Sequence, residues 1–302
     1  MSNIALDQKS GLYVDQELGR KFFLDGPDDL KVGEKVTFLL NLHGGGSHGI
    51  WQRLYFPVHD YTNKYRLVVA TPTAKTKEPL RHWVAEADDE WLHDIVKFVC
   101  AKYGKDRIKS FWLVGHSQGG MTSNRLLKTD FFASRVDGWL SLSGGRIGPV
   151  ELPASFFEGS ELRMPAPAPG SPSPGRAVML DCDISFIFST GRLEIVKLPE
   201  TSPWAEKYNA GPRVRMPDIV DTEKGQVTGA TPGRGPSWGR EARPGTAEIY
   251  VFPNARGNRV IADVVRLDKG HTEGYEPKIT EELIKMIVAA PGGKLAALGR
   301  AG

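Results

Sequence analysis

Ser117 is the residue whose surroundings most clearly predict chemistry. It lies in the motif Gly115-His116-Ser117-Gln118-Gly119-Gly120, which follows the apolar run 110–114 and precedes a helix-compatible segment, 121–128. A G-x-S-x-G motif between a strand and a helix is typical of a nucleophile elbow, in which the serine lies on a strained turn and the glycines let neighbouring backbone approach closely. The motif predicts that Ser117 is a nucleophile above the sheet; a glycine-rich turn without chemistry is the alternative.

A second glycine-rich turn predicts donors for a negatively charged oxygen. The run 36–42 leads directly into His43-Gly44-Gly45-Gly46. Small residues let backbone N–H groups face an incoming oxygen, and the residue after the nucleophile normally supplies another such group. We expect the N–H groups of Gly45 and Gln118 to form an oxyanion hole and His43 to anchor the loop. A turn needed only for packing is the alternative.

The general base that a serine nucleophile needs is predicted to be His271. The chain has seven histidines, and His271 alone follows Ser117. It lies in the polar segment 268–274, before the last predicted helix, where the order serine, acid, histidine that accompanies this elbow places the base. A solvated loop histidine is the alternative.

The acid that orients the base should follow a strand that ends at the same edge of the sheet as the nucleophile. The run 184–190 is such a strand, and Glu194 lies in the turn after it. We expect Glu194 to hold the base in its working tautomer. Three aspartates stay open as alternatives, the first of them at the opposite end of the strand: Asp183, Asp218 and Asp221. Asp263 and Asp268 are expected to be surface charges.

Aromatic residues in or near loops could form the wall of a substrate pocket. Trp51 follows the first glycine turn, and Trp204 and Trp238 lie beyond Glu194. We expect these three tryptophans, together with His116 beside the nucleophile, to contact substrate. Packing in the core is the alternative for each of them.

The elements that must position these residues alternate along the chain. Short apolar runs without polar alternation are typical of strands buried on both faces; they occur at residues 36–42, 66–70, 110–114, 136–142, 184–188 and 247–252. Helical apolar periodicity occurs at residues 88–103 and 279–287. Runs 11–14 and 21–24 could form an antiparallel hairpin. The pattern predicts an α/β fold: a mostly parallel, doubly wound sheet with helices on both faces.

The length fits one domain over residues 1–302, and 34 glycines and 21 prolines mark two insertions. The proline-rich insertion covers residues 146–182. The Gly/Pro-rich insertion covers 201–246, and within it 211–244 is predicted to be a long loop, which could serve as a lid. No internal repeat is evident.

The composition excludes several classes of protein. The 39 Lys and Arg against 36 Asp and Glu leave a net charge of +3, with both signs mixed along the chain, so no nucleic-acid partner is expected. No stretch approaches the roughly 18 apolar residues of a membrane span. The first residues lack the apolar run of a secretory signal, and the two cysteines form no metal cluster, so we expect a cytoplasmic protein. A small molecule is the expected partner; the oligomeric state is not predicted.

Taken together, His43-Gly44-Gly45-Gly46, the Ser117 motif and Gly270-His271-Thr272 resemble the α/β-hydrolase superfamily of serine esterases. Further details resemble its polyhydroxybutyrate depolymerase and feruloyl esterase group: Trp51, Asp88-Asp89 and Gly119-Gly120-Met121. Members of that group often carry aspartate in an H-G-x-x-D turn, whereas this chain has Ser189-Thr190-Gly191-Arg192-Leu193-Glu194. A glutamate can fill the same role.

The resemblance implies a carboxylic ester hydrolase that works through an acyl-enzyme and needs no metal or organic cofactor. We expect a small ester with an aromatic or apolar part rather than a polymer. The same three residues could also serve a lactone, a thioester or an amide. From another class, the alternative is a hydrolase-fold protein that binds a ligand with little turnover.

Overall fold

The computed structural model describes residues 3–147, 150, 152–154, 177–227 and 234–298. Strands and helices alternate along these ranges. The strands are β1 (Ile4–Asp7), β2 (Leu12–Asp15), β3 (Lys21–Asp25), β4 (Val36–Leu42), β5 (Leu67–Pro72), β6 (Ile108–His116), β7 (Gly138–Leu142), β8 (Ser185–Gly191), β9 (Val214–Asp221), β10 (Gly245–Val251) and β11 (Ile261–Arg266).

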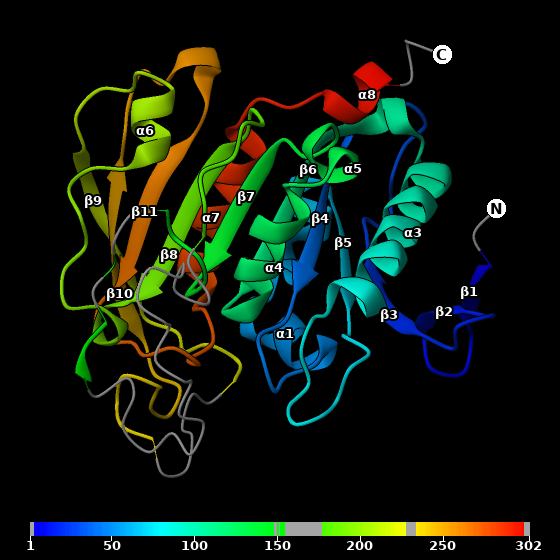
Figure 1. The fold of residues 1–302 in the computed structure, drawn as a ribbon, viewed down its shortest axis with the longest axis horizontal. Coiled ribbons are helices and arrows are strands. Elements are labelled where there is room, and N and C mark those ends of the chain that lie inside the picture. The colour runs from blue at the N-terminus through cyan, green and yellow to red at the C-terminus, as the bar shows by residue number, and fades with distance from the viewer. Residues whose placement is uncertain (1–2, 148–149, 151, 155–176, 228–233, 299–302) are drawn as a thin grey trace.

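The strands form one eleven-stranded sheet with the order β1-β2-β3-β5-β4-β6-β7-β8-β11-β10-β9 (Figure 1). The central strands from β5 to β11 run parallel to one another, and the strands at both edges pair antiparallel. The expected hairpin is present as β2 and β3. The mostly parallel sheet that the apolar runs predict is therefore confirmed.

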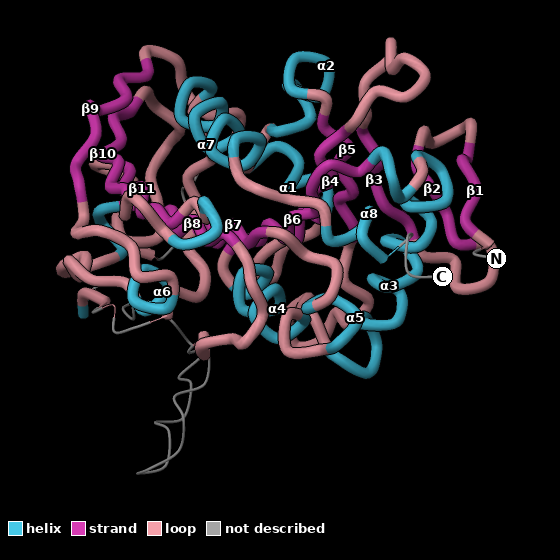
Figure 2. The backbone as a smooth tube through the Cα atoms, turned by 90° about the horizontal axis from the view of Figure 1, so that it is seen from above, coloured by secondary structure: helices cyan, strands magenta, loops and turns pink. Residues whose placement is uncertain are grey.

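Helices cover both faces of the sheet (Figure 2). They are α1 (Gly49–Tyr55), α2 (Thr62–Tyr65), α3 (Ala85–Tyr103), α4 (Gln118–Leu126), α5 (Asp130–Ala133), α6 (Pro203–Lys207), α7 (Pro277–Ala289) and α8 (Lys294–Leu298). The core on one face includes side chains of α3, α4, α5, α6 and α8, and the core on the other includes side chains of α1 and α7. The predicted double winding is thus confirmed as well.

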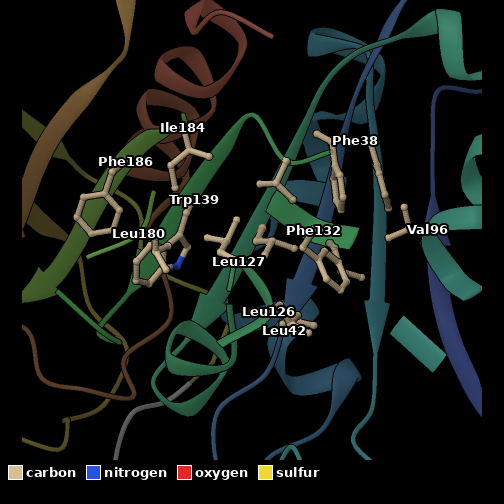
Figure 3. Close-up of a cluster of buried hydrophobic side chains, with 14 of the residues drawn as sticks. Phe38, Leu42, Val96, Leu126, Leu127, Phe132, Trp139, Leu180, Ile184 and Phe186 are labelled. Atoms are coloured by element: carbon tan, nitrogen blue, oxygen red, sulfur yellow. The ribbon is translucent and has the colours of Figure 1, made fainter. Parts of the chain in front are cut away.

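Apolar side chains pack the central strands tightly between the helix layers. All seven residues of β4 are buried, because helices remove both faces of the strand from water. On the face of α3 and α4, Phe38 stacks on Phe111 with ring centroids 4.6 Å apart, and Trp139 lies 4.8 Å from Phe186 (Figure 3). Close packing of this kind fixes the ends of β4, β6 and β8, from which the site is built.

Three strands, β1, β9 and β11, have no counterpart among the predicted runs. In β11, Asp263 interrupts the apolar pattern, and its expected place on the surface is wrong. Its carboxylate is buried and accepts hydrogen bonds from Nε and Nη2 of Arg146 at 3.1 and 2.9 Å. A carboxylate is stable inside a protein when a cation pairs with it, and here that cation lies far away in the sequence.

The two predicted insertions differ in how much of them the structure describes. Most of 146–182 lies outside the described residues. Within 201–246, the expectation of an unstructured loop is wrong for residues 214–221, which form β9 and pair with β10. That this insertion acts as a lid stays a prediction. Across the described ranges, no helix combines the length and apolar character needed to cross a membrane.

Candidate active site

Ser117 lies at the turn between β6 and α4, at the carboxyl edge of the parallel strands. Its backbone angles, φ 51° and ψ −117°, fall in a region that residues with a side chain rarely adopt. The turn is tight: a Cβ placed on Gly119 would lie 2.3 Å from the carbonyl oxygen of Leu42, so only glycine fits there. The turn has the geometry expected of a nucleophile elbow.

Three side chains from distant parts of the chain form one hydrogen-bonded series. Ser117 Oγ donates to Nε2 of His271 at 2.8 Å, and Nδ1 of His271 donates to Oε2 of Glu194 at 2.6 Å. His271 and Glu194 are buried, whereas Ser117 is half-buried. Because a carboxylate accepts the hydrogen of Nδ1, it selects the tautomer whose Nε2 lone pair faces the hydroxyl. The structure thus brings together the three residues predicted as nucleophile, base and acid.

The second oxygen of Glu194 has its own set of donors. Glu194 Oε1 accepts hydrogen bonds from Ser143 Oγ at 2.6 Å, from the Gly191 N–H at 2.7 Å and from Thr190 Oγ1 at 3.3 Å. Burial alone raises the pKa of the Glu194 carboxyl. The charge of protonated His271 and the hydrogen bonds from His271, Ser143 and Gly191 outweigh it, and the pKa lies below its ordinary value. Glu194 is therefore held as a carboxylate.

The other acids considered for this role lie elsewhere. Among the described residues, Glu194 is the only carboxylate hydrogen-bonded to His271. The alternatives are Asp183, exposed before β8; Asp218, bonded to Arg215; and Asp221, which accepts from the Lys278 N–H at the start of α7. Asp268 is exposed and ion-paired with Arg240 and Arg243, as expected of a surface charge.

The glycine loop after β4 lies against the elbow. A Cβ placed on Gly44 would lie 3.2 Å from Ser117 Cβ, and one placed on Gly45 would lie 3.7 Å from Oε1 of Gln118. The Gln118 N–H is in the first turn of α4, where it has no partner within the helix. Neither it nor the Gly45 N–H donates to another described residue. Both groups predicted for the oxyanion hole are therefore near the nucleophile and without an acceptor in this part of the chain.

His43 fixes the glycine loop, as expected. Its Nδ1 donates to the Gly44 carbonyl at 2.7 Å, and its Nε2 accepts from the Ala74 N–H at 3.0 Å. The Trp83 indole N–H donates to the His43 carbonyl at 2.8 Å. Burial lowers the pKa of His43 to about 4, so the ring is neutral and serves as an anchor.

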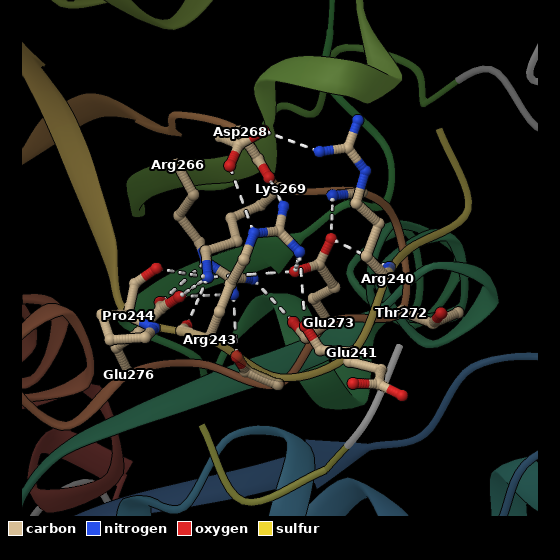
Figure 4. Close-up of polar contacts among 12 residues, drawn as sticks. Arg240, Glu241, Arg243, Pro244, Arg266, Asp268, Lys269, Thr272, Glu273 and Glu276 are labelled. Carbon is tan, nitrogen blue, oxygen red and sulfur yellow. Dashed lines mark hydrogen bonds and ion pairs between the residues drawn. The ribbon is translucent and has the colours of Figure 1, made fainter. Parts of the chain in front are cut away.

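Buried charges hold both ends of the loop that carries His271 (Figure 4). Arg266, at the end of β11, pairs with Glu276 before α7, with Nε and Oε2 3.1 Å apart. Lys269 Nζ lies 2.7 Å from the other oxygen of Glu276. The Arg266 guanidinium also donates to the main-chain carbonyls of Glu273 and Gly274. The loop is thus tied to the strand before it and to the helix after it.

Glu273 ties the same loop to the segment that precedes β10. Its Oε1 accepts from the N–H groups of Gly270 and Arg240 at 3.0 and 3.1 Å, and its Oε2 accepts from Arg243 Nη1 at 2.9 Å. Glu273 is buried, and Lys269 Nζ lies 3.8 Å from Oε2. The position of His271 therefore depends on this carboxylate.

Trp238 lies beside His271, the residue predicted as the base. The His271 N–H donates to the Ser237 carbonyl at 3.0 Å, and the Thr272 N–H donates to the Trp238 carbonyl at 2.9 Å. The Trp238 ring meets the His271 ring edge to face, with centroids 4.9 Å apart, and is half-buried. Of the three tryptophans predicted to contact substrate, Trp238 is therefore the one whose ring borders His271.

The other three predicted substrate contacts lie differently. Trp204 is fully buried, stacked between Phe186 and Tyr208, so its prediction as a pocket residue is wrong. Trp204 and Ala205 are the two buried core positions of α6. His116 is also buried, and its Nε2 is bonded to the His271 carbonyl; the prediction of a substrate contact is wrong for it too. Trp51 is half-buried against Tyr55 and His116, and a substrate contact there stays a prediction.

Two residues of the site are absent from the sequence prediction: Ser143 and Tyr55. Ser143 bonds Glu194, and the Tyr55 hydroxyl donates to the His271 carbonyl at 3.2 Å. The sequence Ser143-Gly144-Gly145 directly after a buried strand is a signal of a tight turn at the carboxyl edge. Tyr55 gives no such signal, because its contact joins residues more than 200 positions apart.

Comparisons with known proteins bear on the fold. No family model matches the sequence, and no curated protein matches it. The chain is similar to the solved structure of an acetyl xylan esterase from Aspergillus awamori, with a TM-score of 0.52 and 12% identity over 94% of this chain and 98% of that chain. A fluorophosphonate-binding serine hydrolase, FphF of Staphylococcus aureus, covers 64% of this chain and 78% of its own, with a TM-score of 0.35 and 15% identity. The narrower resemblance to polyhydroxybutyrate depolymerases and feruloyl esterases stays a prediction. The structural similarity to the acetyl xylan esterase covers nearly the whole of both proteins. Together with the strand order of the sheet and the helices on both of its faces, it shows that this protein has the α/β-hydrolase fold.

Proposed function

We propose that this protein is a serine hydrolase of carboxylic esters that works through an acyl-enzyme. The observation that carries the proposal is the series of two short hydrogen bonds, Ser117 Oγ to His271 Nε2 at 2.8 Å and His271 Nδ1 to Glu194 Oε2 at 2.6 Å. A nucleophile within reach of a base, and a base oriented by a carboxylate, is the arrangement that acyl transfer requires. A protein that only bound a ligand would have no need of all three groups.

In acylation, Ser117 Oγ attacks the ester carbonyl carbon while His271 Nε2 takes the hydroxyl proton. The carbonyl oxygen becomes an oxyanion, which the N–H groups of Gly45 and Gln118 stabilise. Each such donor typically contributes about 2.7 to 4 kcal/mol to the transition state. The tetrahedral intermediate then breaks its bond to the alcohol oxygen, which receives the proton from His271.

Deacylation repeats these steps with water. His271 takes a proton from the water as the water oxygen attacks the acyl-enzyme, and it returns that proton to Ser117 Oγ when the acid product leaves. Glu194 remains a carboxylate throughout. It holds the Nδ1–H tautomer and stabilises the imidazolium that forms in each half of the reaction.

We infer that the substrate is a small ester with an aromatic or apolar part. The Trp238 ring contacts the His271 ring edge to face. The half-buried Trp51 ring contacts His116, which lies between it and His271. Aromatic side chains offer large apolar surfaces to a flat or apolar group. The Gly-rich loops bring backbone rather than side chains to the reacting carbonyl.

A chromogenic ester assay tests the proposal. Wild-type protein should hydrolyse 4-nitrophenyl acetate, and Ser117→Ala should reduce kcat to the uncatalysed background. Glu194→Gln should lower kcat by about 10²- to 10⁴-fold, because the amide no longer selects the working tautomer. Asp183→Asn, at the far end of β8, is the matched control and should retain full activity. Undiminished hydrolysis by Ser117→Ala would overturn the mechanism.

A further inference from the structure

The main-chain carbonyl of His271 accepts two hydrogen bonds from buried side chains. The Tyr55 hydroxyl donates to it at 3.2 Å, and Nε2 of His116 lies 2.9 Å from it. A carbonyl oxygen has no hydrogen to give, so His116 Nε2 must carry one. This contact therefore defines the tautomer of His116: the hydrogen is on Nε2, and Nδ1 has a lone pair.

The other ring nitrogen of His116 faces the glycine loop. His116 Nδ1 is buried and has no hydrogen-bond partner among the described residues. A Cβ placed on Gly44 would lie 2.6 Å from it, so this glycine packs directly on the ring. Burial, together with the charge of nearby His271, lowers the pKa of His116 well below its ordinary value. The ring is therefore neutral and keeps one tautomer.

Aromatic rings confine the imidazole from the remaining sides. The Tyr55 ring centroid lies 4.2 Å from that of His116, and the Trp51 centroid lies 5.3 Å away. The His271 ring is on another side, at 4.9 Å. With 3% of its surface exposed, His116 has little surface with which to contact a substrate. Its neighbours are parts of the site itself.

We propose that His116 is a positioning residue that sets the distance between the nucleophile and the base, with Tyr55 as a second donor to the same carbonyl. His116 directly precedes Ser117 in the chain, its Nε2–H holds the backbone of His271, and its other edge supports Gly44 beside the oxyanion donors. One side chain thus joins three segments that are far apart in the sequence. The inference rests on the proposed function, because it assigns a role within that reaction.

The expected consequence is a loss in kcat with KM preserved. Without the Nε2–H donor, the His271 backbone can move away from Ser117, and a misplacement of about 1 Å can cost about 10²-fold in rate. Substrate binding does not use this contact, so KM should change by less than about twofold. A role in substrate binding would produce the reverse pattern.

Two isosteric substitutions test the role. The amide nitrogen of Gln reaches close to the position of Nε2, whereas that of Asn reaches close to Nδ1 and cannot donate to the His271 carbonyl. We expect His116→Asn to lower kcat for 4-nitrophenyl acetate by about 10- to 100-fold, and His116→Gln to restore most of that loss. Tyr55→Phe should lower kcat less, and its effect should grow in the His116→Asn background, where no donor remains.

Stability must be measured beside activity, because a buried histidine also contributes to packing. If the role were only structural, kcat would follow the free energy of unfolding, and Asn and Gln would lower both alike. His93→Asn, in α3 and stacked on Phe131, is the matched control and should leave kcat unchanged. Nitrogen-15 NMR of the imidazoles gives a readout without turnover: His116 should show the Nε2–H tautomer from pH 5 to pH 8.

The experiments distinguish a failure of the proposed function from a failure of the positioning role of His116. Equal activity of wild type and Ser117→Ala overturns the proposed function. An active wild type in which His116→Asn and His116→Gln have the same kcat overturns the positioning role alone. So does a raised KM with kcat preserved, or an NMR signal of the Nδ1–H tautomer.

Discussion

Ser143 Oγ donates a 2.6 Å hydrogen bond to Oε1 of Glu194, the carboxylate oxygen that does not face His271. Ser143 adopts a left-handed φ of 49° directly after β7. Such a conformation costs a residue with a side chain about 1 to 3 kcal/mol and persists where the surrounding structure enforces it. The fold thus holds a strained residue in contact with Glu194, the proposed acid, and Ser143 is therefore included in the candidate site.

Replacing Ser143 by alanine should remove a hydrogen bond that keeps Glu194 ionised. The hydrogen bond from Ser143 lowers the pKa of the Glu194 carboxyl, so its loss raises that pKa and moves the acid limb of the kcat/KM profile to higher pH. A hydrogen bond to a charged group contributes about 1.5 to 3 kcal/mol, so kcat/KM should fall by about tenfold or more. The measurement is kcat/KM for a 4-nitrophenyl ester from pH 4 to pH 8. Ser134→Ala, on the surface after α5, is the control; an unmoved acid limb in Ser143→Ala would contradict the expected link.

The buried His43 predicts a loss of stability at acid pH. Its folded pKa is about 4 against an ordinary value of 6.5. Between these values the unfolded chain binds a proton that the folded chain does not, so the free energy of unfolding falls as the pH falls through this window. The full contribution is on the order of 3 kcal/mol.

Urea unfolding at pH 7 and pH 4.5 measures the effect of His43. The difference between the two pH values should be smaller in His43→Gln than in wild type, because the glutamine binds no proton. Comparing differences removes the direct cost of the substitution. An identical pH dependence in both proteins would show that His43 is not the neutral anchor described above.

The Glu273 carboxylate should matter for stability as well as for rate. Glu273→Gln keeps an acceptor for the Gly270 N–H but removes the charge that faces Arg243 and Lys269. Breaking one partner of a buried ion pair costs about 3 to 5 kcal/mol. We expect the lower end of this range, because Lys269 retains Glu276. Glu282→Gln, at an exposed pair with Lys285, should cost less than about 1 kcal/mol in the same urea experiment. Equal costs at both positions would mean that the cluster does not hold the loop.

Substitution of Trp238 should change substrate preference, whereas substitution of Trp204 should change stability. Trp238→Ala removes the ring beside His271 and should lower kcat/KM for a benzoate ester more than for an acetate ester, by about tenfold. Trp204→Ala creates a cavity in the core and should cost about 3 to 5 kcal/mol of stability, with the ratio of the two esters unchanged. A panel of 4-nitrophenyl esters and urea unfolding check both arms. The inference of an aromatic or apolar substrate fails if Trp238→Ala leaves the ratio as it is in wild type.

Several residues of the candidate site could be predicted from the residues next to them and from their order in the chain. The nucleophile motif sits between an apolar run and a helix, so Ser117 could be predicted from residues next to it. Chain order placed His271, and the position of Glu194 after β8 followed from the rule that parallel strands end at one edge. The β4 run was predicted with its observed bounds, because a strand buried on both faces is apolar throughout.

The sequence did not predict the place of residues whose position depends on a partner far away in the chain. Asp263 reads as a surface charge until Arg146 is known to pair with it. Trp204 reads as a loop aromatic, but α6 packs it between Phe186 and Tyr208. His116 reads as a substrate contact because it adjoins Ser117, and only the folded chain places the His271 carbonyl over it. In each case, a contact with a residue far away in the sequence determines where the side chain lies.

The proposed mechanism requires Ser117 to be a nucleophile that His271 and Glu194 activate. Labelling with a fluorophosphonate, followed by peptide mapping by mass spectrometry, tests it without knowledge of the substrate. We expect one adduct per folded chain, on Ser117, with no adduct in Ser117→Ala and slower labelling in His271→Ala. A folded wild type that remains unlabelled, or an adduct on another residue, would show that Ser117 is not the nucleophile.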